Sequence, residues 1–358
     1  MTQTNKSYAT ATITKLDKSR LEIVGSIPSE VWEKFRPRAL ETLNQTITLH
    51  GFRKGQVPEN ILVAKIGEKA VLEEMAELAL SQAYVEILID NKIDAIGQPA
   101  VSLMKLAAGN PLEFKAVTAV VPGVSLSDYK KIAAEAVKKL PVSKSEVTDK
   151  EVDEAILRIR KQNASHENHD HDKLSPEEHE KLLMDNLPEF TDDFVRGLGD
   201  FSSIEDFKQK VRVMIGENKK DEAKEKVRLT IADALCEAVK IELPDVMIES
   251  ELTRTQTQFA ADVERMGVKM DDYLKHAKKT LEEVRSEWRP HAEKKAKLQL
   301  ILNAIADAEK IKPDQKEIEA EVSHIVEHYK DADRERAAVY AETVLTNEKV
   351  FQFLEKAE

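Results

Sequence analysis

From Pro188 to the end of the chain, apolar residues recur three or four positions apart, which restricts this half of the protein to α-helices. Residues at that spacing lie on one face of a helix, so each stripe predicts an amphipathic helix with an apolar face. One stripe consists of Val227, Ile231, Ala234, Leu235 and Ala238. Others begin at Ile248, Leu298 and Ile318. We interpret these faces as core surfaces in preference to ligand surfaces.

The composition indicates a helix-rich protein with more than one domain. A chain of 358 residues is long enough for about two or three domains, each with its own core. Charged residues make up 34% of it and aromatic residues 5%, which is typical of helices with much exposed surface. The formal charge of −12 argues against general binding to nucleic acid or to acidic membranes.

Cysteine usage and the start of the sequence indicate a cytoplasmic protein. The single cysteine, Cys236, permits no intramolecular disulfide, and its apolar neighbours predict a buried thiol. Residues 1–7 lack the apolar core of a signal peptide, and no apolar run approaches the length that spans a bilayer. We therefore expect a cytoplasmic location and no membrane partner.

The first 124 residues carry both strand and helix signals. Segments rich in Thr, Val and Ile predict two strand pairs, at residues 8–14 with 20–27 and at 99–104 with 112–121. A helix is predicted from near Pro28 up to His50, and helical patterns cover residues 58–90 with an interruption near Gly67. Strand pairs around helices indicate a small α+β domain over residues 1–124.

Residues 125–187 form a polar connector between this domain and the helices of residues 188–358. A capping-box pattern that starts at Thr148 predicts a linker helix at about residues 148–163. Residues 163–187 contain no Gly, Phe, Tyr or Trp, so this stretch cannot pack a domain of its own. The expected fold is an α+β N-terminal domain followed by an extended, all-α C-terminal domain.

A histidine cluster in the connector is the strongest candidate for a metal site. It consists of His166, His169, His171 and His179, with Asp170 and Asp172 beside them. Imidazole and carboxylate groups bind divalent metals, but the spacing matches no regular secondary structure. We favour a solvated loop that attracts Ni²⁺ or Zn²⁺ loosely over a built metal site, and we expect no cofactor.

Several enzymatic motifs are missing from the sequence. No glycine cluster is followed by Lys and Ser or Thr as in a phosphate-binding loop, so ATP-driven function is not expected. The serine-hydrolase and zinc-protease motifs are also missing, as is a cysteine pair for zinc or redox chemistry. These absences disfavour nucleotide-driven, hydrolytic and redox enzymes.

Residues 51–58 form the most distinctive local motif. In order they are Gly51, Phe52, Arg53, Lys54, Gly55, Gln56, Val57 and Pro58. Glycine permits positive φ and proline fixes φ, so this composition predicts a loop that ends the preceding helix and presents its tip to a partner. The alternative is that Phe52 folds back as an apolar plug while the cations are only solvated. Local composition does not decide between the two.

The surroundings of this loop are basic although the chain is acidic. Between Trp32 and Lys54 the positive residues are Lys34, Arg36, Arg38, Arg53 and Lys54, and the negative ones are Glu33 and Glu41. We call residues 32–54 the basic segment. Such a local excess of positive charge suits one anionic docking surface.

The loop, which follows a helix inside an α+β domain, resembles the ribosome-docking signature of the bacterial trigger factor family. The resemblance continues at residues 148–164, which are similar to the linker helix of that family. It also continues at residues 187–194 and 241–244, which are similar to its helical substrate-binding domain. The resemblance implies an ATP-independent chaperone that docks at the exit tunnel of the large ribosomal subunit and shields nascent or unfolded polypeptides.

The same resemblance implies roles for the loop residues. Docking would involve Gly51, Phe52, Arg53, Lys54, Gly55 and Pro58. The two cations would pair with RNA phosphate or with an acidic side chain of a ribosomal protein, and Phe52 would enter an apolar niche. The family further suggests that molecules off the ribosome form homodimers, which neither charge nor spacing decides.

One departure from the family pattern concerns catalysis. Most members of the family carry a prolyl isomerase domain of the FK506-binding type between the linker helix and the segment at Leu187. Here only the short stretch after Asn163 joins the two, and it has no aromatic residues to enclose a proline ring. We expect a trigger factor that has lost its isomerase and is not an enzyme. The alternatives are an isomerase with an unrecognised pocket and a ribosome-associated assembly factor that holds no clients.

Overall fold

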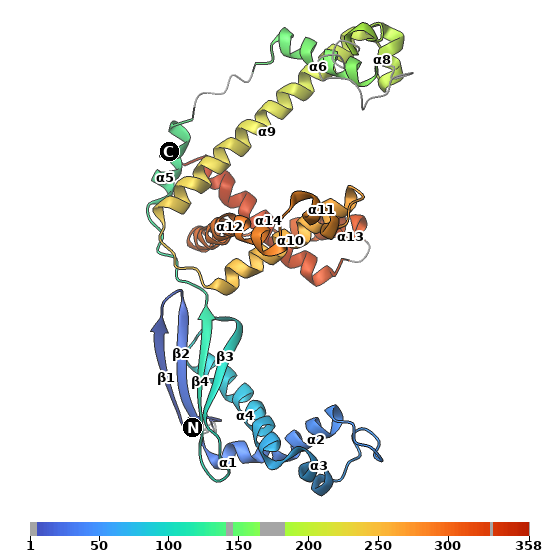
Figure 1. Cartoon of the computed structure of the whole chain (residues 1–358). Helices are drawn as coiled ribbons and strands as arrows, with labels where there is room; N and C mark the ends of the chain where they lie inside the picture. Colours follow the sequence, from blue (N-terminus) through green and yellow to red (C-terminus); the bar gives the residue numbers. More distant parts are fainter. Residues whose placement is uncertain (1–5, 141–145, 165–182, 330–331, 358) are drawn as a thin grey trace. The chain divides into compact units, whose positions relative to one another are not determined.

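The structure is a computed structural model that describes residues 6–140, 146–164, 183–329 and 332–357 (Figure 1). The chain divides into two compact units, and each is built from two separate segments. The first unit comprises Met1–Ser127 with Val239–Glu309, and the second comprises Asp128–Ala238 with Lys310–Glu358. Segments far apart in the sequence therefore pack together within each unit.

A four-stranded antiparallel sheet belongs to the first unit. Its strands are β1 (Thr10–Leu16), β2 (Arg20–Ile27), β3 (Ala95–Lys105) and β4 (Leu112–Val120), in the spatial order β1-β2-β4-β3. The two predicted strand pairs are both present, and they join because β2 pairs with β4. The turn between β1 and β2 places Lys18 and Ser19 at φ 58° and 50°, the left-handed conformation of a tight hairpin turn.

Helices that lie between the strand pairs in sequence share one core with this sheet. They are α1 (Ser29–Trp32), the 3₁₀ turn η1 (Glu33–Phe35), α2 (Arg36–Thr46), α3 (Glu59–Ile66) and α4 (Glu68–Asp90). The long helix α4 packs against β2 and buries Met75 and Ala79 in one core with the strand residues Ile23 and Phe114. The ring of Phe114 packs over β2 because Gly25 has no side chain, since a Cβ at Gly25 would lie 2.7 Å from Phe114 Cζ.

A second group of helices completes the first unit. These are α10 (Asp245–Arg265), α11 (Met270–Ala277) and α12 (Leu281–Glu309). Helices α10 and α12 pack through Ile248, Leu252 and Ala292. The ring of Phe259 meets that of Trp288 edge-on, with ring centroids 5.2 Å apart. The predicted stripe that begins at Ile248 is therefore a core face.

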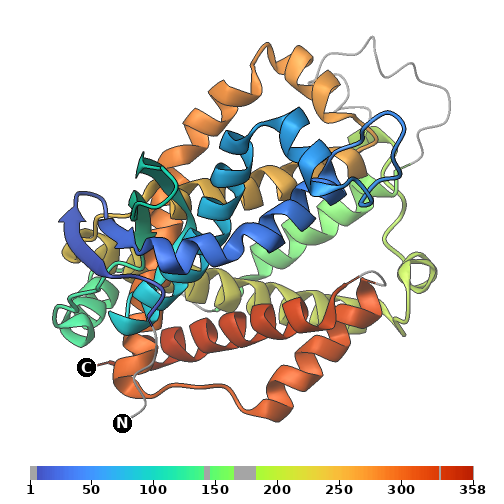
Figure 2. The ribbon, with the colours of Figure 1, turned by 90° about the horizontal axis from the view of Figure 1, so that it is seen from below.

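The regular elements that the structure describes in the second unit are helices. Its helices include α5 (Tyr129–Lys138), α6 (Asp149–Gln162), α8 (Asp192–Leu198), α9 (Ile204–Ala238), α13 (Gln315–His328) and α14 (Arg334–Glu355). Helix α9 packs against α5 and α14, while α13 and α14, red in Figure 2, lie side by side. The start of α9 forms a smaller core with α6 and α8 around Phe207 and Val211. The predicted fold class, an α+β part followed by helices, is confirmed.

Candidate functional site

The loop between α2 and α3 begins earlier than the sequence predicts. The helix expected to reach His50 ends at Thr46, so that expectation was wrong at its boundary. The hydroxyl of Thr46 donates to the backbone carbonyls of Thr42 and Leu43 at 3.2 and 3.1 Å, and β-branched Ile47 has extended backbone. Both features compete with continuation of a helix.

Two glycines give the loop its shape. Gly51 and Gly55 have φ values of 91° and 79°, which non-glycine residues adopt only with strain. The N–H of Phe52 donates to the carbonyl of Leu49 at 3.2 Å, and the N–H of Gln56 donates to that of Arg53 at 3.0 Å. The loop is therefore two tight turns in series.

The tip of the loop lies in solvent. Phe52 is 37% exposed, and Gly51, Arg53 and Lys54 are exposed beside it. Val57, by contrast, is buried at the point where the chain returns to the domain, and Pro58 then precedes the first turn of α3. The loop thus offers one ring and two cations on a shaped support.

A polar groove of about 660 Å³ lies at the foot of the loop. It is bounded by α2, by α3 and by residues 55–57, which we call the returning limb of the loop. Residues that line the groove include Glu41, Asn44, Gly55 and Leu62. Asn44 also bonds to the returning limb of the loop, which places this residue at the junction of helix and loop.

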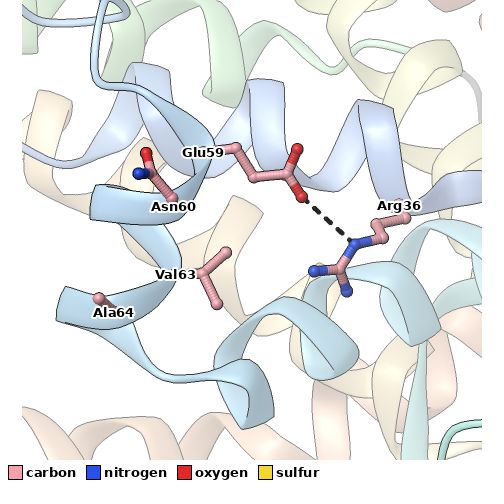
Figure 3. A pocket seen from close by; sticks show the side chains of 5 residues that line it. All are labelled: Arg36, Glu59, Asn60, Val63 and Ala64. Atoms are coloured by element: carbon pink, nitrogen blue, oxygen red, sulfur yellow. Dashed lines mark ion pairs between the residues drawn. The ribbon is translucent and has the colours of Figure 1, made fainter.

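A second hollow, of about 540 Å³, is lined by Arg36, Glu59, Asn60, Val63 and Ala64 (Figure 3). Arg36 Nε lies 3.5 Å from Glu59 Oε1, and Arg36 also makes a two-pronged contact with Glu68 on α4. The hydrogen bond from Arg36 lowers the pKa of the Glu68 carboxyl below its ordinary value. Arg36 thus ties α2 to α3 and α4. Although the basic segment includes it, this guanidinium is already engaged by carboxylates.

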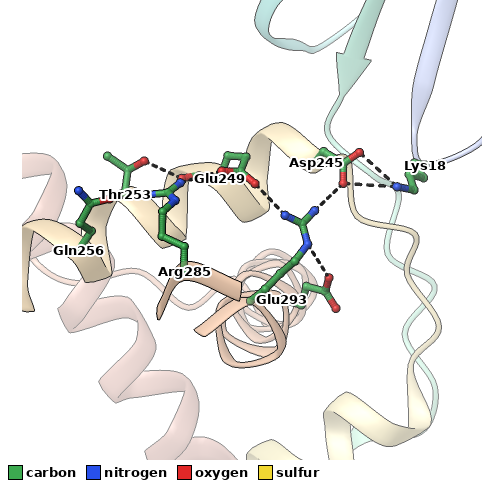
Figure 4. Close-up of polar contacts among 8 residues, drawn as sticks. Lys18, Asp245, Glu249, Thr253, Gln256, Arg285 and Glu293 are labelled. Carbon is green, nitrogen blue, oxygen red and sulfur yellow. Dashed lines mark hydrogen bonds and ion pairs between the residues drawn. The ribbon is translucent and has the colours of Figure 1, made fainter. Parts of the chain in front are cut away.

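A charged network joins α10 to α12 (Figure 4). Arg285 Nη2 donates to Glu249 at 2.7 Å, and Arg289 donates to both Glu249 and Asp245 at 2.7 and 2.8 Å. These bonds lower the pKa of the Glu249 carboxyl, with Arg285 the larger cause. Lys18, from the β1–β2 turn, reaches Asp245 at 3.2 Å. The network therefore links the sheet to the helices within the first unit.

Helices of the second unit carry exposed apolar side chains. On α14, Val339 and Tyr340 are 67% and 61% exposed, and Val344 follows on the same helix. Near the start of α9 an apolar pocket of about 300 Å³ contains Phe201 and Met214 in its lining. Sequence patterning did not single out these residues, and the only signal was apolar side chains at positions off the core stripe.

The remaining predictions concern metal binding, the single cysteine and membrane-spanning helices. The candidate metal ligands His166, His169 and His171 lie outside the described residues, as does His179. Within the described ranges no three His, Cys, Asp or Glu side chains gather in a way that could hold a metal ion. Cys236 is buried, as its neighbours predicted. Among the helices that the structure describes, none combines the length and the apolar character needed to cross a membrane.

An α+β domain with an exposed aromatic and basic loop, together with helices that carry exposed apolar side chains, suits a chaperone that binds polypeptides. The family model described as "Bacterial trigger factor protein (TF)" matches residues 9–159, and that described as "Bacterial trigger factor protein (TF) C-terminus" matches residues 203–355. The chain belongs to the bacterial trigger factor family, whose members are ribosome-associated chaperones.

Known relatives and a solved structure agree with that family. The trigger factor of Moorella thermoacetica is 24% identical, over 88% of this chain and 86% of the relative. That of Streptomyces coelicolor is 24% identical, over 85% of this chain and 78% of the relative. A structure reported as "Promiscuous Substrate Recognition in Folding and Assembly Activities of the Trigger Factor Chaperone" has a TM-score of 0.55. It is 18% identical and covers 98% of this chain and 100% of that chain, which shows a shared fold.

Proposed function

We propose that this protein is an ATP-independent chaperone that docks beside the exit tunnel of the large ribosomal subunit through the loop after α2. The docking residues are Gly51, Phe52, Arg53, Lys54, Gly55 and Pro58. The observation that carries the proposal is the exposed tip, in which one aromatic ring and two cations project from a loop that two positive-φ glycines shape.

The chemistry of the tip suits a ribosomal surface. Arg53 supplies a planar fork for RNA phosphate or a carboxylate, Lys54 supplies a mobile point charge, and Phe52 supplies apolar area. Arg36 is not assigned to docking, because its guanidinium already pairs with Glu59 and Glu68. The docking charge therefore resides in the loop itself.

The helical part is proposed to hold unfolded and nascent polypeptides. Functionally, we divide the chain into a ribosome-binding domain at 1–124, a connector at 125–187 and a substrate-binding domain at 188–358. The exposed side chains Val339, Tyr340 and Val344 give α14 an apolar surface of the kind that binds unfolded chains. Docking raises the local concentration of this surface near an emerging chain, so weak affinity at each contact suffices.

We propose that the protein lacks the isomerase domain of its relatives. The two family models leave residues 160–202 between them, fewer than the roughly 50 residues of the smallest ordinary domains. The alignment with the Moorella relative runs over 389 positions, more than the 358 residues of this chain, so the relative has residues that this chain lacks. Catalysis of a proline-limited refolding reaction at low protein-to-substrate ratios would overturn this part of the proposal.

A cytoplasmic location and homodimers off the ribosome complete the proposal, since both belong to the family resemblance. Sedimentation equilibrium of the pure protein over a range of concentrations tests for the dimer. A single species with the monomer mass at every concentration would exclude it.

Ribosome co-sedimentation tests docking. A variant with Phe52, Arg53 and Lys54 changed to alanine should pellet with large subunits much less than the wild type does. The matched control removes two exposed lysines and one exposed apolar side chain from α3 and α4 of the same domain, Lys65, Lys69 and Ile89. The control should bind as the wild type does, and undiminished binding by the loop variant would refute docking through this loop.

Client holding is tested separately. The wild type should suppress aggregation of a chemically denatured protein on dilution, without ribosomes and without ATP. If it binds ribosomes but does not suppress aggregation, the alternative of an assembly factor that holds no clients is favoured.

A further inference from the structure

Asn44 joins helix α2 to the returning limb of the docking loop. Its side-chain Nδ2 donates to the carbonyl of Val57 at 2.8 Å, and the N–H of Val57 donates to its Oδ1 at 3.1 Å. In addition, the N–H of Gly55 donates to the backbone carbonyl of Asn44 at 3.0 Å. One residue in the last turn of α2 therefore holds two residues of the loop.

These bonds are the loop's polar anchors to the rest of the domain. Apart from the bonds at its two ends, the other backbone bonds that the structure describes for residues 48–57 are local, from Phe52 to Leu49 and from Gln56 to Arg53. They shape the tip but do not fix it to the domain. Val57 is only 4% exposed, so water cannot readily replace Asn44 as a partner for its backbone groups.

We infer that Asn44 is a positioning residue for ribosome docking, an inference that rests on the docking function proposed above for the loop. The asparagine amide presents one donor and one acceptor in a plane, which matches the N–H and C=O of Val57. Aspartate has nearly the same shape but donates no hydrogen bond when ionised, and its charge faces the carbonyl of Val57. Alanine offers neither group.

Loss of this pairing should reduce docking without altering the docking chemistry. The glycines at positions 51 and 55 leave the loop many conformations once its returning limb is released. Apparent affinity falls in proportion to the fraction of molecules whose loop has the docking shape. For Asn44→Ala we expect binding to ribosomes that is about tenfold weaker.

The salt dependence separates this role from direct contact. Asn44→Ala leaves the positive charges of Arg53 and Lys54 in place, so the slope of log affinity against log salt should stay as in the wild type. The variant with Phe52, Arg53 and Lys54 changed to alanine removes those charges and should flatten the slope. A positioning residue thus lowers affinity at every salt concentration by the same factor.

The experiment titrates the full chain against purified large ribosomal subunits at several salt concentrations. Asn44→Ala and Asn44→Asp should both bind about tenfold more weakly. Gln45→Ala, which alters the neighbouring exposed side chain in the same groove, should bind as the wild type does. Adding Asn44→Ala to the triple-alanine loop variant should cause no further loss, because the two changes act through one loop.

Amide hydrogen exchange reports the cause directly. In Asn44→Ala the amides of Gly55 and Val57 should exchange faster, while those of α4 stay protected. Wild-type affinity for both Asn44 variants, with binding lost in the triple-alanine variant, would overturn the inference and leave the docking loop intact. Wild-type affinity for Asn44→Asp alone would show that the hydrogen bond from Asn44 Nδ2 to the carbonyl of Val57 is not needed, which also overturns the inference. Undiminished binding by the triple-alanine variant would instead refute the docking function itself.

Discussion

Arg228 and Lys224 on α9 both pair with Glu348 on α14, and replacement of the arginine tests the energetics of the second unit. Arg228 on α9 donates from Nη1 and Nη2 to the two oxygens of Glu348 at 2.5 and 2.7 Å, and from Nε to Glu355 at 2.6 Å. Its guanidinium also lies over the ring of Phe351, 5.5 Å from the centroid. Arg228→Met keeps most of the side-chain volume but removes each of these polar contacts.

The structure sets the size of the expected effect. The side chain of Arg228 is 21% exposed and that of Glu348 is 35% exposed. Loss of an exposed ion pair costs roughly 0.2–1 kcal/mol, whereas removal of one partner of a buried pair costs roughly 3–5 kcal/mol. The side chains are partly buried, and Arg228 makes two hydrogen bonds to the one carboxylate of Glu348. The expected cost of this change therefore lies between those limits. We expect Arg228→Met to lower the free energy of opening α14 by about 2 kcal/mol.

The same contact makes stability depend on pH. Hydrogen bonds from Arg228 are the largest cause that lowers the pKa of the Glu348 carboxyl from 4.5 to about 2. Because the folded-state pKa lies below the unfolded value, the unfolded state binds more protons between them. The stabilisation is therefore complete above pH 5 or so, and it is lost as the pH falls towards 2. Arg228→Met should lose most of this acid-dependent component.

Hydrogen exchange in α14 is the suitable assay, because a chain with two compact units need not unfold in one step. A change of about 2 kcal/mol should speed exchange of the α14 amides about thirtyfold at neutral pH. Arg228→Lys keeps the charge without the fork and should fall between wild type and Arg228→Met. Arg265→Met, which breaks an exposed pair with Asp262, is the control and should leave α14 unchanged. The reasoning would be refuted if the α14 amides of Arg228→Met exchanged at the wild-type rate. It would also be refuted if their protection fell with decreasing pH as much as it does in the wild type.

Three further changes test other contacts. Gly97→Ala should destabilise the first unit by about 1–2 kcal/mol, because Gly97 has φ 71° and a Cβ there would lie 2.9 Å from Val246 Cγ2. Adding Val246→Ala should restore part of the melting temperature, and no recovery would argue against this clash. Ser19→Ala removes the 2.8 Å bond from Ser19 Oγ to the carbonyl of Glu242, and should speed exchange at the start of α10 by the equivalent of about 1 kcal/mol. Phe207→Ala should cost about 3–5 kcal/mol, because the ring is buried and meets the ring of Phe201 at 4.8 Å; retained protection of α6 amides would contradict it.

Elements set by neighbouring residues could be predicted from the sequence. The capping box at Thr148 is present, since the N–H of Glu151 donates to Thr148 Oγ1 at 3.4 Å and the N–H of Thr148 donates to Glu151 at 2.9 Å. Gly67 separates α3 from α4 at φ 87°, where an interruption was expected. Helix α9 begins at Ile204 after Ser203, whose Oγ accepts from the N–H of Asp206 at 3.3 Å. Local bonds alone decide these features.

Features set by distant residues could not be predicted in this way. The order β1-β2-β4-β3 depends on pairing between strands that are separated by all the helices of that domain. Lys18 meets Asp245, which is 227 residues away. Arg36 was included among the cations of the basic segment, but this side chain forms an ion pair with Glu68 from α4. None of these partners leaves a periodic or compositional signal in the sequence, because each contact forms only when the tertiary fold brings distant segments together.

In the proposed docking loop, the groups that would contact the ribosome and the groups that shape the loop lie in different parts of the sequence. Phe52, Arg53 and Lys54 sit between two glycines and are recognisable as a motif. Asn44 on α2 holds the returning limb, and Arg36 ties α2 to α3. An exposed tip has few packing contacts of its own, so its conformation depends on those supports. A motif match alone therefore establishes which chemistry a loop carries, whereas its affinity also depends on residues outside the motif that hold the loop in shape.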